Sequence, residues 1–345
     1  KADLNNLKDI FFKFHVGHLS EFKIESFSKK NKFTLYNIKV ESKTINETIE
    51  NLKVQYADVN NLKEVTEKSN IYSKITYKDK EHKGLLDIKI LDKKESKKLI
   101  GKKLNDRINI DLKKLSKNDE GTVSQILGDS IKLKDIPSKV ALQIENIIER
   151  TPAQLNTTFF DKIFGPGKVK NKKDFNAEIK KSIEFNYMRE TEFYLNRIIE
   201  NELLSKNKIE MPNGYVEDWV KKNNDEETSK KIINEQFEDY CKQIKWSYIV
   251  DDIVEKYKIS VENEEIEQVA KSQIEQQLMS SGMQNVGKDI NEFVDNYLKH
   301  NKGENYLKIF NQVKSNKVFN TIKEKSTITK KSITFDKFKT LASKL

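Results

Sequence analysis

The sequence predicts an elongated, multidomain protein of the α+β class, and three observations support this. The chain has 345 residues, whereas a single hydrophobic core seldom serves more than about 250–300 residues. Apolar residues recur with a period of two between residues 62 and 150, and with a helical period from 151 almost to the end. Only 36% of the residues are apolar and 34% are charged, which favours an extended molecule over one compact globule.

The first region, residues 1–61, combines extended segments with one helix. Apolar residues at every second position predict a strand from Ile10 to Val16, and a second extended run covers Tyr36 to Val40. Thr44 and Glu47 have the spacing of a capping box, so we expect them to open a helix. Its apolar positions are Ile45, Ile49, Leu52 and Tyr56. This helix has the character of a linker to the next domain.

The second region, residues 62–150, is predicted to be a small domain of mostly antiparallel strands. Period-two patterns mark four strands, at residues 71–77, 86–90, 108–112 and 140–144. The connections between them are short, and those at residues 95–101 and 121–128 have helical character. Short connections favour antiparallel pairing.

The third region, residues 151–345, is predicted to be mainly helical. Thr151 and Pro152 have the residue types of a helix start, and the turn at residues 165–167 ends this short helix. A long helix to Leu203 follows, and Met211–Pro212 breaks it. Further helices are expected at residues 215–220, 232–254, 260–278 with Ser260 as the cap, 290–297 and 306–322, and an extended piece at 333–338.

Several functional classes find no support in the sequence. There is no apolar run of about 18 residues that would suggest a membrane span. The lone Cys241 allows no internal disulfide and fits a reducing compartment. The two closest histidines, His15 and His18, point to opposite faces of a predicted strand, so we expect no metal site. No nucleophile has a base beside it in the pattern, and we predict no catalytic residue and no cofactor.

The net charge of +10 raises the alternative of a basic, non-specific nucleic-acid-binding protein. Almost all of this charge is lysine, whereas arginine is the residue suited to bidentate contacts with phosphates and bases. Lysines also alternate with acidic residues along nearly the whole chain, which is typical of a solvated mixed surface. The alternative requires lysines gathered on one face and an affinity that falls steeply with salt.

The order of these regions resembles bacterial trigger factor, in a form close to its Bacteroidetes branch. The similarity is local in residues 12–22 (FKFHVGHLSEF), 34–56, 260–278, 297–305 and 334–338, and is greatest in residues 151–169 (TPAQLNTTFFDKIFGPGKV). It implies a remnant of the ribosome-binding domain with its linker in residues 1–61, an inserted FKBP-like domain in 62–150, and a helical chaperone domain with arm-like hairpins in 151–345. The family's Gly-Phe-Arg-x-Gly-Lys ribosome-docking loop is not among these residues.

The resemblance implies an ATP-independent, cytoplasmic chaperone that holds unfolded or nascent polypeptides in a helical cradle. It implies contact with the ribosome in the full-length protein, although not through these residues, and it is compatible with a weak homodimer. One alternative is a periplasmic helical chaperone, which would need a signal peptide upstream of Lys1. The other alternative is an active prolyl isomerase.

Prolyl isomerisation in the family uses a pocket lined by aromatic side chains. Between Lys78 and Thr158 the sequence contains no Phe, Tyr or Trp. Tyr72 or Tyr77 can contribute to such a pocket, and Leu and Ile can form an apolar wall. The sequence therefore predicts a degenerate isomerase domain and leaves its activity open.

The residues expected to bind clients lie around the turn near residues 279–297, where methionines and aromatics flank two glycines. Methionine adapts its shape to many partners. The equally weighted alternative is that these residues form the core of a helical hairpin. The candidates are Leu278, Met279, Met283, Phe293, Val294 and Tyr297, and the weaker candidates are Tyr215, Trp219 and Trp246.

Overall fold

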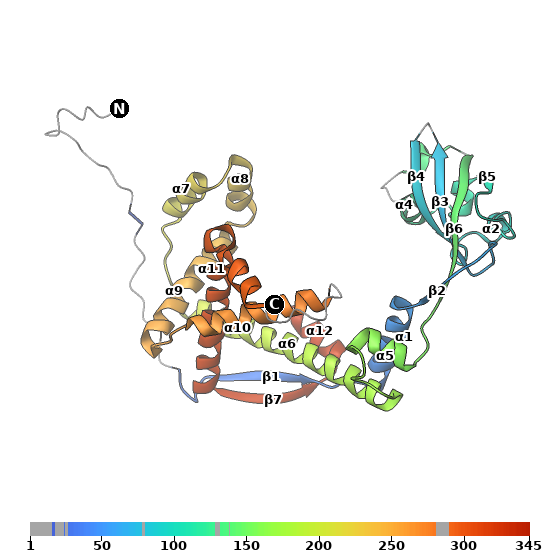
Figure 1. Ribbon diagram of the computed structural model, residues 1–345. Helices are drawn as coiled ribbons and strands as arrows, with labels where there is room; N and C mark the ends of the chain where they lie inside the picture. Colours follow the sequence, from blue (N-terminus) through green and yellow to red (C-terminus); the bar gives the residue numbers. More distant parts are fainter. Residues whose placement is uncertain are drawn as a thin grey trace, which may run out of the picture. The chain divides into compact units, whose positions relative to one another are not determined.

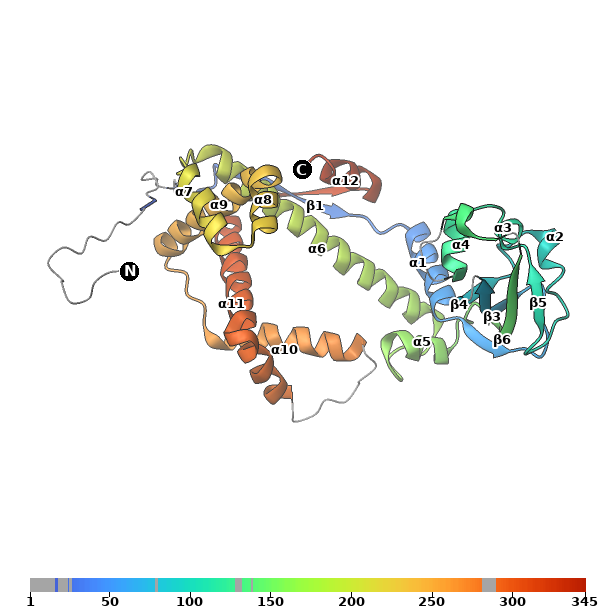
Figure 2. The same ribbon diagram turned by 90° about the horizontal axis from the view of Figure 1, so that it is seen from above.

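A computed structural model describes residues 16–17, 24, 27–77, 80–127, 132–137, 139–280 and 290–345, with the side chains of Tyr77, Asp135, Met279, Ser280 and Asn301 excepted. The chain divides into two compact units. The β unit comprises residues 40–183, and the helical unit comprises residues 1–39 and 184–345. The helical unit is therefore discontinuous in sequence. Figures 1 and 2 show the elements of each unit from two directions.

The β unit contains an antiparallel sheet of five strands. Its strands are β2 (Asp58–Asn61), β3 (Ser69–Tyr77), β4 (Lys80–Asp87), β5 (Arg107–Ile110) and β6 (Val140–Thr151). The order is β2-β6-β3-β4, and β5 pairs with the beginning of β6. The long strand β6 thus pairs with three others, because β2 occupies its far end. The predicted antiparallel β domain is confirmed.

Several strand limits differ from the predicted ones. Ile88 and Ile90 follow β4 in a turn, and Leu112 begins helix α3 (Leu112–Leu115). Strand β2 was not predicted, because its sequence DVNN is exposed at every position and has no apolar alternation. Thr151 ends β6 and does not cap a helix. Helix α5 (Thr157–Phe164) begins later, where Asn156 Oδ1 accepts a hydrogen bond from Phe159 N at 3.0 Å.

Aliphatic side chains fill the core of the sheet. Ile71, Ile75, Leu86, Leu142 and Ile144 are all fully buried. Helix α4 (Glu120–Leu127) covers the sheet with Val123, Ile126 and Leu127. A Cβ at Gly84 would lie 2.1 Å from the Ile126 carbonyl oxygen, so β4 and α4 approach each other where no side chain fits. The 3-10 helix η2 (Leu133–Asp135) precedes β6.

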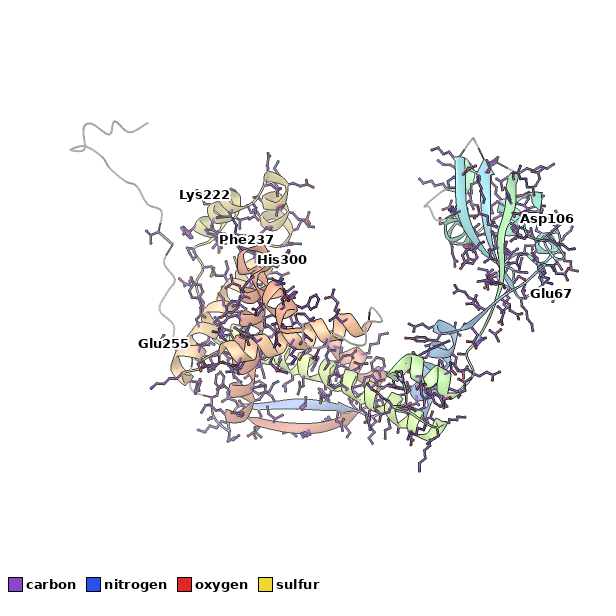
Figure 3. All side chains as sticks on the ribbon, viewed as in Figure 1. Glu67, Asp106, Lys222, Phe237, Glu255 and His300 are labelled. Atoms are coloured by element: carbon purple, nitrogen blue, oxygen red, sulfur yellow. The ribbon has the colours of Figure 1, made fainter. Side chains whose placement is uncertain are left out.

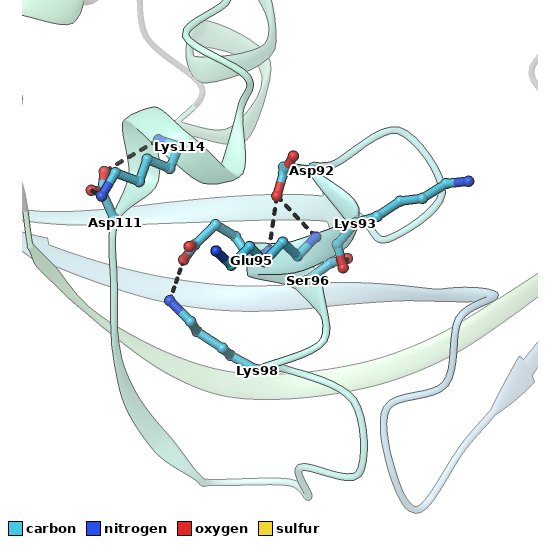
Figure 4. A network of polar contacts seen from close by, with 8 residues as sticks. Asp92, Lys93, Glu95, Ser96, Lys98, Asp111 and Lys114 are labelled. Atoms are coloured by element: carbon cyan, nitrogen blue, oxygen red, sulfur yellow. Dashed lines mark hydrogen bonds and ion pairs between the residues drawn. The ribbon is translucent and has the colours of Figure 1, made fainter.

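Short helices in this unit begin at side-chain caps (Figure 4). Asp92 caps α2 (Lys93–Ser96) by accepting hydrogen bonds from Lys94 N and Glu95 N, both at 2.9 Å. Glu95 then pairs with Lys98 at 2.6 Å. In the same way Asp111 caps α3 and pairs with the Lys114 ammonium at 3.4 Å. The lysines paired in these helices lie three residues after their carboxylates.

The rest of the β unit is helical. Helix α1 (Ser42–Gln55) begins two residues before Thr44, with Glu41 at the N-cap and no side-chain cap, so the predicted capping box is wrong. The start of α6 (Lys172–Lys206) packs against α5 through stacked aromatics, with the rings of Phe160 and Phe175 4.6 Å apart. Figure 3 shows Glu67 and Asp106 on the loops of the unit.

The helical unit continues α6 and adds five long or medium helices. They are α7 (Asn213–Asn223), α8 (Glu226–Glu235), α9 (Phe237–Tyr257), α10 (Asn263–Ser280) and α11 (Ile290–Lys325). The predicted break at Met211–Pro212 is found, directly before α7. The single helix expected over residues 232–254 is two helices, because Gln236 leaves the helical conformation between α8 and α9.

Two other helix predictions need correction. Ser260 does not cap α10, which begins three residues later, and the Ser260 carbonyl accepts a hydrogen bond from Lys317 Nζ instead. The last two predicted helices belong to one element, α11, but Lys302 and Gly303 inside it have φ values of 58° and 85°. The Asn305 side chain donates to the Tyr297 carbonyl across this point at 2.9 Å. The chain therefore bends sharply between the two predicted segments.

A two-stranded parallel ribbon joins the two ends of the described chain. Strand β1 (Lys32–Ile38) pairs with β7 (Thr327–Ile333) over the full length of both. Helix α12 (Phe335–Ala342) follows β7, so the extended piece expected at residues 333–338 is wrong beyond Ile333. Figure 1 shows the ribbon beside α12. Of the strand expected at residues 10–16, only Val16 is described, and it lies in no strand.

Two apolar clusters hold the helical unit together. The larger joins Leu195 and Ile199 of α6 to Ile249 and Ile253 of α9 and to Ile322 of α11. It also includes Phe33 of β1. The smaller cluster lies within the hairpin formed by α10 and α11. Helices α7 and α8 pack on each other, and α8 packs on α9; Figures 1 and 2 show the three helices together.

Candidate functional site

An apolar groove lies on the surface of the helical unit between α7 and α9. Its volume is about 250 Å³. Helix α7 and the residues before it contribute Met211, Pro212, Tyr215, Val216 and Trp219 to the walls. Helix α9 contributes Tyr240, Ile244 and Tyr248. Four of these residues are aromatic and none is charged. Lys222, near the end of α7, and Phe237, at the start of α9, are labelled in Figure 3.

The sequence of α7 places its aromatic residues at the surface. Pro212 occupies the N-cap position, where its missing N–H costs no hydrogen bond. Val216 and Val220 are buried, and four residues separate them. Tyr215 and Trp219 each precede one of these valines, so they share a neighbouring face of the helix. Burial of the valines therefore directs both aromatics into the groove.

Helix α9 completes the groove with a stripe at helical spacing. Tyr240, Ile244 and Tyr248 are four residues apart, so they follow one side of the helix. The adjacent side carries Ile249 and Ile253, which are fully buried in the core of the unit. Helix α9 thus uses one face for the core and a neighbouring face for the groove.

Three aromatic side chains in the groove are strongly exposed. Tyr215 is 40% exposed, Trp219 is 46% exposed and Tyr248 is 43% exposed. Water in contact with such apolar surface is released when another apolar group covers it, which favours binding. Tyrosine and tryptophan also carry one polar atom each, so they suit a surface that is covered at some times and wet at others.

Two neighbouring ionisable groups at or next to the groove, Tyr240 and Cys241, have raised pKa values. Burial raises the pKa of the Tyr240 phenol, and the neighbouring Cys241 raises it further. Burial likewise raises the pKa of the Cys241 thiol; Lys245 acts in the opposite direction and Glu217 in the same one. The raised pKa favours the protonated thiol, whereas the thiolate is the nucleophilic form of cysteine.

A backbone segment of the chain itself lies against the groove. Gly17 borders it, and a Cβ at Gly17 would come within 2.6 Å of Tyr215 Cδ1. Only a glycine allows the main chain to approach the tyrosine ring so closely. The next residue on the N-terminal side, Val16, is 83% exposed. The aromatic wall thus already contacts a polypeptide backbone that belongs to no helix or strand.

The residues predicted around the α10–α11 turn fall into different environments. Val294 is buried in the hairpin core with Ile266 and Ile274, and Leu278 and Tyr297 are partly buried against the same core. Phe293, in contrast, is 50% exposed. The side chain of Met279 and the whole of Met283 lie outside the described residues. The described members of this group are therefore split between the hairpin core and its surface.

The three weaker candidates are also separated. Tyr215 and Trp219 lie together in the groove. Trp246 is partly buried against the larger core and stacks on Phe319 with ring centroids 5.4 Å apart. Trp246 is therefore a packing residue of α9 and α11.

The β unit offers aliphatic surfaces in place of an aromatic pocket. Its sheet core contains only Val, Ile and Leu side chains among the described residues. Tyr72 is on β3 and 38% exposed, and the side chain of Tyr77 lies outside the described residues.

Neither a metal centre nor a membrane-spanning helix is found in the described part of the chain. No three His, Cys, Asp or Glu residues gather there as metal ligands would. Likewise, none of the helices described above is long and apolar enough to cross a membrane.

Sequence reasoning missed Tyr240, Ile244, Tyr248 and Met211 as parts of the surface site. The first three lie inside the helix predicted over residues 232–254, and no surface role was predicted for them. The available signal was the pair of apolar stripes on α9, one at residues 240, 244 and 248 and the other at residues 249 and 253. A helix at the surface buries one stripe, so a second stripe indicates a further contact surface.

Two family models match successive parts of the chain. The model described as "Probable trigger factor, FKBP-like domain" matches residues 59–152. The model described as "Probable trigger factor, C-terminal domain" matches residues 190–342. No curated protein matches the chain.

A solved structure from work on promiscuous substrate recognition in folding and assembly by the trigger factor chaperone is also similar. The alignment covers 83% of this chain and 70% of that chain, at 14% sequence identity and a TM-score of 0.46. At these values the similarity carries no argument of its own.

Proposed function

Because the chain belongs to the trigger factor family of folding chaperones, we propose that it holds unfolded or nascent polypeptides on its helical unit without ATP, and that the α7–α9 groove is a binding surface. The exposed aromatics Tyr215, Trp219 and Tyr248 carry this proposal. The contact of the Gly17 backbone with Tyr215 supports it, because it provides an example of a non-helical segment on this wall.

Holding would proceed by burial of apolar area. Each Å² of apolar surface removed from water contributes about 25 cal/mol, and a groove of about 250 Å³ accepts only a few side chains. A single contact is therefore weak, so an unfolded chain uses several such surfaces and leaves each one quickly. Charged residues around the groove, including Glu217 and Lys221 of α7, keep the complex in solution.

The tip of the α10–α11 hairpin is a second proposed surface. Phe293 supports this part of the proposal, since half of its surface is exposed. Leu278, Met279, Met283, Val294 and Tyr297 belong to the same proposed surface. The proposal also includes domain boundaries at residues 61 and 150 and a cytoplasmic localisation. It further includes a weak homodimer, and contact with the ribosome through segments outside this sequence.

The test is suppression of aggregation of an unrelated, chemically denatured protein by the full chain at micromolar concentration. The variant Tyr215→Ser/Trp219→Ser/Tyr248→Ser should suppress aggregation markedly less than the parent. Circular dichroism and urea unfolding establish whether the variant is folded.

The matched control replaces exposed apolar residues of the β unit by Tyr72→Ser/Ile90→Ser/Leu104→Ser, where the parent side chains are 38%, 44% and 50% exposed. This control should retain full suppression. A folded groove variant with unchanged suppression would refute the groove as a binding surface. No suppression by the parent would refute the holding function itself.

Prolyl isomerisation is a second candidate function, favoured by the FKBP-like match of residues 59–152. The aliphatic core of the β unit argues for weak activity, because aliphatic walls lack the flat aromatic faces that the family uses. The measurement is the rate of cis–trans conversion of a proline-containing peptide with the full chain. Acceleration that disappears in Tyr72→Ser would assign a pocket to β3, whereas a rate equal to that of buffer would exclude this function.

A further inference from the structure

The positive charge of the chain is concentrated in two short segments. Residues 27–39 and 323–345 together hold eleven lysines and two carboxylates, Glu324 and Asp336. Their net charge is +9, whereas that of the whole chain is +10. The rest of the sequence is thus almost neutral. The expectation that lysines are interleaved with acidic residues holds for the remainder and fails for these segments.

The fold brings the two segments together. Strand β1 from the first segment and β7 from the second pair in parallel, with Leu35 opposite Lys330 and Tyr36 opposite Lys331. Helix α12 packs on this ribbon through Phe338, whose ring lies 6.3 Å from that of Tyr36. Almost 300 residues of sequence separate the segments, but they form one structure, which we call the basic module (residues 27–39 and 323–345). Figure 1 shows β1 in blue, next to β7 and α12 in red.

Three of the eleven lysines make contacts within the fold or are partly buried. The Lys29 ammonium donates hydrogen bonds to the carbonyl oxygens of Glu324 and Ser326, at 2.7 and 2.8 Å. Lys325 lies over the Tyr257 ring, 4.8 Å from its centroid. Lys323 is partly buried. Lys29 therefore holds the module together and Lys325 contacts α9, whereas Lys323 is only partly exposed to solvent.

The other eight lysines have no carboxylate partner among the described residues. They are all exposed, namely Lys30, Lys32, Lys39, Lys330, Lys331, Lys337, Lys339 and Lys344. In other parts of the protein many lysines pair with a carboxylate three or four residues away, as Lys98 does with Glu95 (Figure 4). Within the described part of the chain, the module thus presents eight exposed cations without ion-pair partners.

Protection of a strand edge accounts for only part of this charge. The ribbon has two strands, so β7 has an unpaired outer edge, and lysines on such an edge discourage pairing with other chains. Successive residues of a strand point to opposite faces, so Lys330 and Lys331 flank that edge on both sides. Strand β1 has an outer edge as well, and Lys32 lies on that strand. The other five unpaired lysines lie on α12 or next to the ribbon and α12, where edge protection does not require them.

We propose that the basic module binds the phosphate backbone of RNA without reading its sequence. Lysine suits this task, because it acts as a point charge toward phosphates, and the module contains no arginine for bidentate contacts with bases. Neutralisation of phosphates releases condensed counterions and supplies the affinity. The choice of RNA rests on the proposed function, because nascent polypeptides leave a particle whose surface is largely RNA.

An acidic protein is the competing partner, and the surface favours it less. Protein interfaces need an apolar centre inside a polar rim. Large exposed apolar side chains in the described module are limited to Phe335 and Leu345, and Phe335 is stacked on Tyr187 with ring centroids 5.1 Å apart. The module therefore offers charge without an apolar centre.

The test measures binding of a labelled single-stranded uridine 20-mer to the full chain by fluorescence anisotropy, between 50 and 200 mM salt. The variant is Lys330→Glu/Lys331→Glu/Lys337→Glu/Lys339→Glu. The logarithm of the binding constant falls linearly with the logarithm of the salt concentration, and each lysine on a single-strand phosphate makes this slope steeper by about 0.7. For the variant, this slope should therefore be shallower by about 3, and the RNA should bind more weakly on the order of a hundredfold at 0.1 M salt.

The matched control makes the same change in charge on the β unit, by Lys63→Glu/Lys68→Glu/Lys89→Glu/Lys102→Glu, at four exposed lysines. It should weaken binding much less than the module variant. Equal losses in the two variants would overturn the assignment to the module. Equal competition by a polyglutamate of the same charge would overturn RNA in favour of an acidic protein. A second module variant replaces the same four lysines by glutamine, which adds no negative charge to the fold. Its binding should also depend less steeply on salt than that of the parent.

The two proposals fail independently. Suppression of aggregation in buffer without RNA should be the same for the module variant and the parent. Loss of suppression in a folded module variant would show that the module binds unfolded polypeptides, and would contradict the RNA assignment.

Discussion

Replacement by alanine should have different effects at the two tryptophans of the chain, on client binding at one and on stability at the other. Trp219 lies in the groove and is 46% exposed, whereas Trp246 stacks on Phe319 against the core. A tryptophan buries roughly 150–250 Å² when it is covered, so a bound segment can cover about 100 Å² more of Trp219. At about 25 cal/mol per Å² this gives up to roughly 2.5 kcal/mol, and ordering of the bound segment offsets part of it.

We therefore expect Trp219→Ala to weaken client binding by about 1.5 kcal/mol, which is roughly tenfold in Kd. The free energy of unfolding should change by less than about 0.5 kcal/mol, because the side chain is largely at the surface. Trp246→Ala should instead lower the free energy of unfolding by about 3 kcal/mol through loss of packing, with client affinity retained in the molecules that stay folded.

The assay uses a labelled protein that reduction and alkylation keep permanently unfolded. Anisotropy titration gives Kd, and urea unfolding gives stability. In a Trp246→Phe background, the emission of Trp219 should also shift to shorter wavelength on client binding, because water leaves the indole. Unchanged Kd and unchanged emission for Trp219 would refute the groove as a client surface.

Three further predictions concern packing, backbone and charge. Gly84→Ala should destabilise the β unit by about 2–4 kcal/mol, because the new Cβ would lie 2.1 Å from the Ile126 carbonyl and α4 must move; urea unfolding measures it. Gly303→Ala should destabilise the helical unit by about 1 kcal/mol, since φ there is +85°, again by urea unfolding. Burial lowers the pKa of Lys323, against the attraction of Glu192. Its charged form thus costs stability at neutral pH, and Lys323→Met should raise the free energy of unfolding there. The difference should shrink as the pH rises through the folded pKa toward 10.5.

Each of these predictions has a control. Gly121→Ala in α4 should not destabilise the β unit comparably, because its Cβ would meet only the end of the Asp119 side chain, at 3.3 Å. Gly101→Ala should cost about as much as Gly303→Ala, because φ is +79° there and the space is open. Equal stability of parent and Lys323→Met from pH 7 to 10.5 would contradict the burial of that amine.

Periodicity in the sequence predicted most elements of the fold, and its errors have local causes. The strands at residues 71–77 and 140–144 have one buried face, so their apolar alternation is regular. Strand β2 has no buried face and gave no signal. The breaks at Gln236 and at Lys302–Gly303 lie inside uninterrupted helical patterns, and tertiary packing decides them.

The candidate site was less predictable, because periodicity identifies an apolar face but not what covers it. Phe293 and Val294 are adjacent in the sequence, yet the first is half exposed and the second is buried. Tyr240 and Tyr248 belong to a predicted helix, but only the position of α7 shows that they line a groove. The basic module escaped detection for the same reason, since strand pairing between residues 32–38 and 327–333 is a long-range contact.

The parallel pairing of β1 with β7 has a consequence for the synthesis of this protein. Strand β1 is synthesised before the β unit, and its partner β7 is synthesised only after the β unit and helices α6 to α11. The β unit is contiguous and can fold while translation continues, whereas contacts of high sequence separation form slowly and late. During that interval the early strand has an unpaired edge. A protein proposed to hold nascent chains therefore has an unpaired strand of its own until β7 has been synthesised.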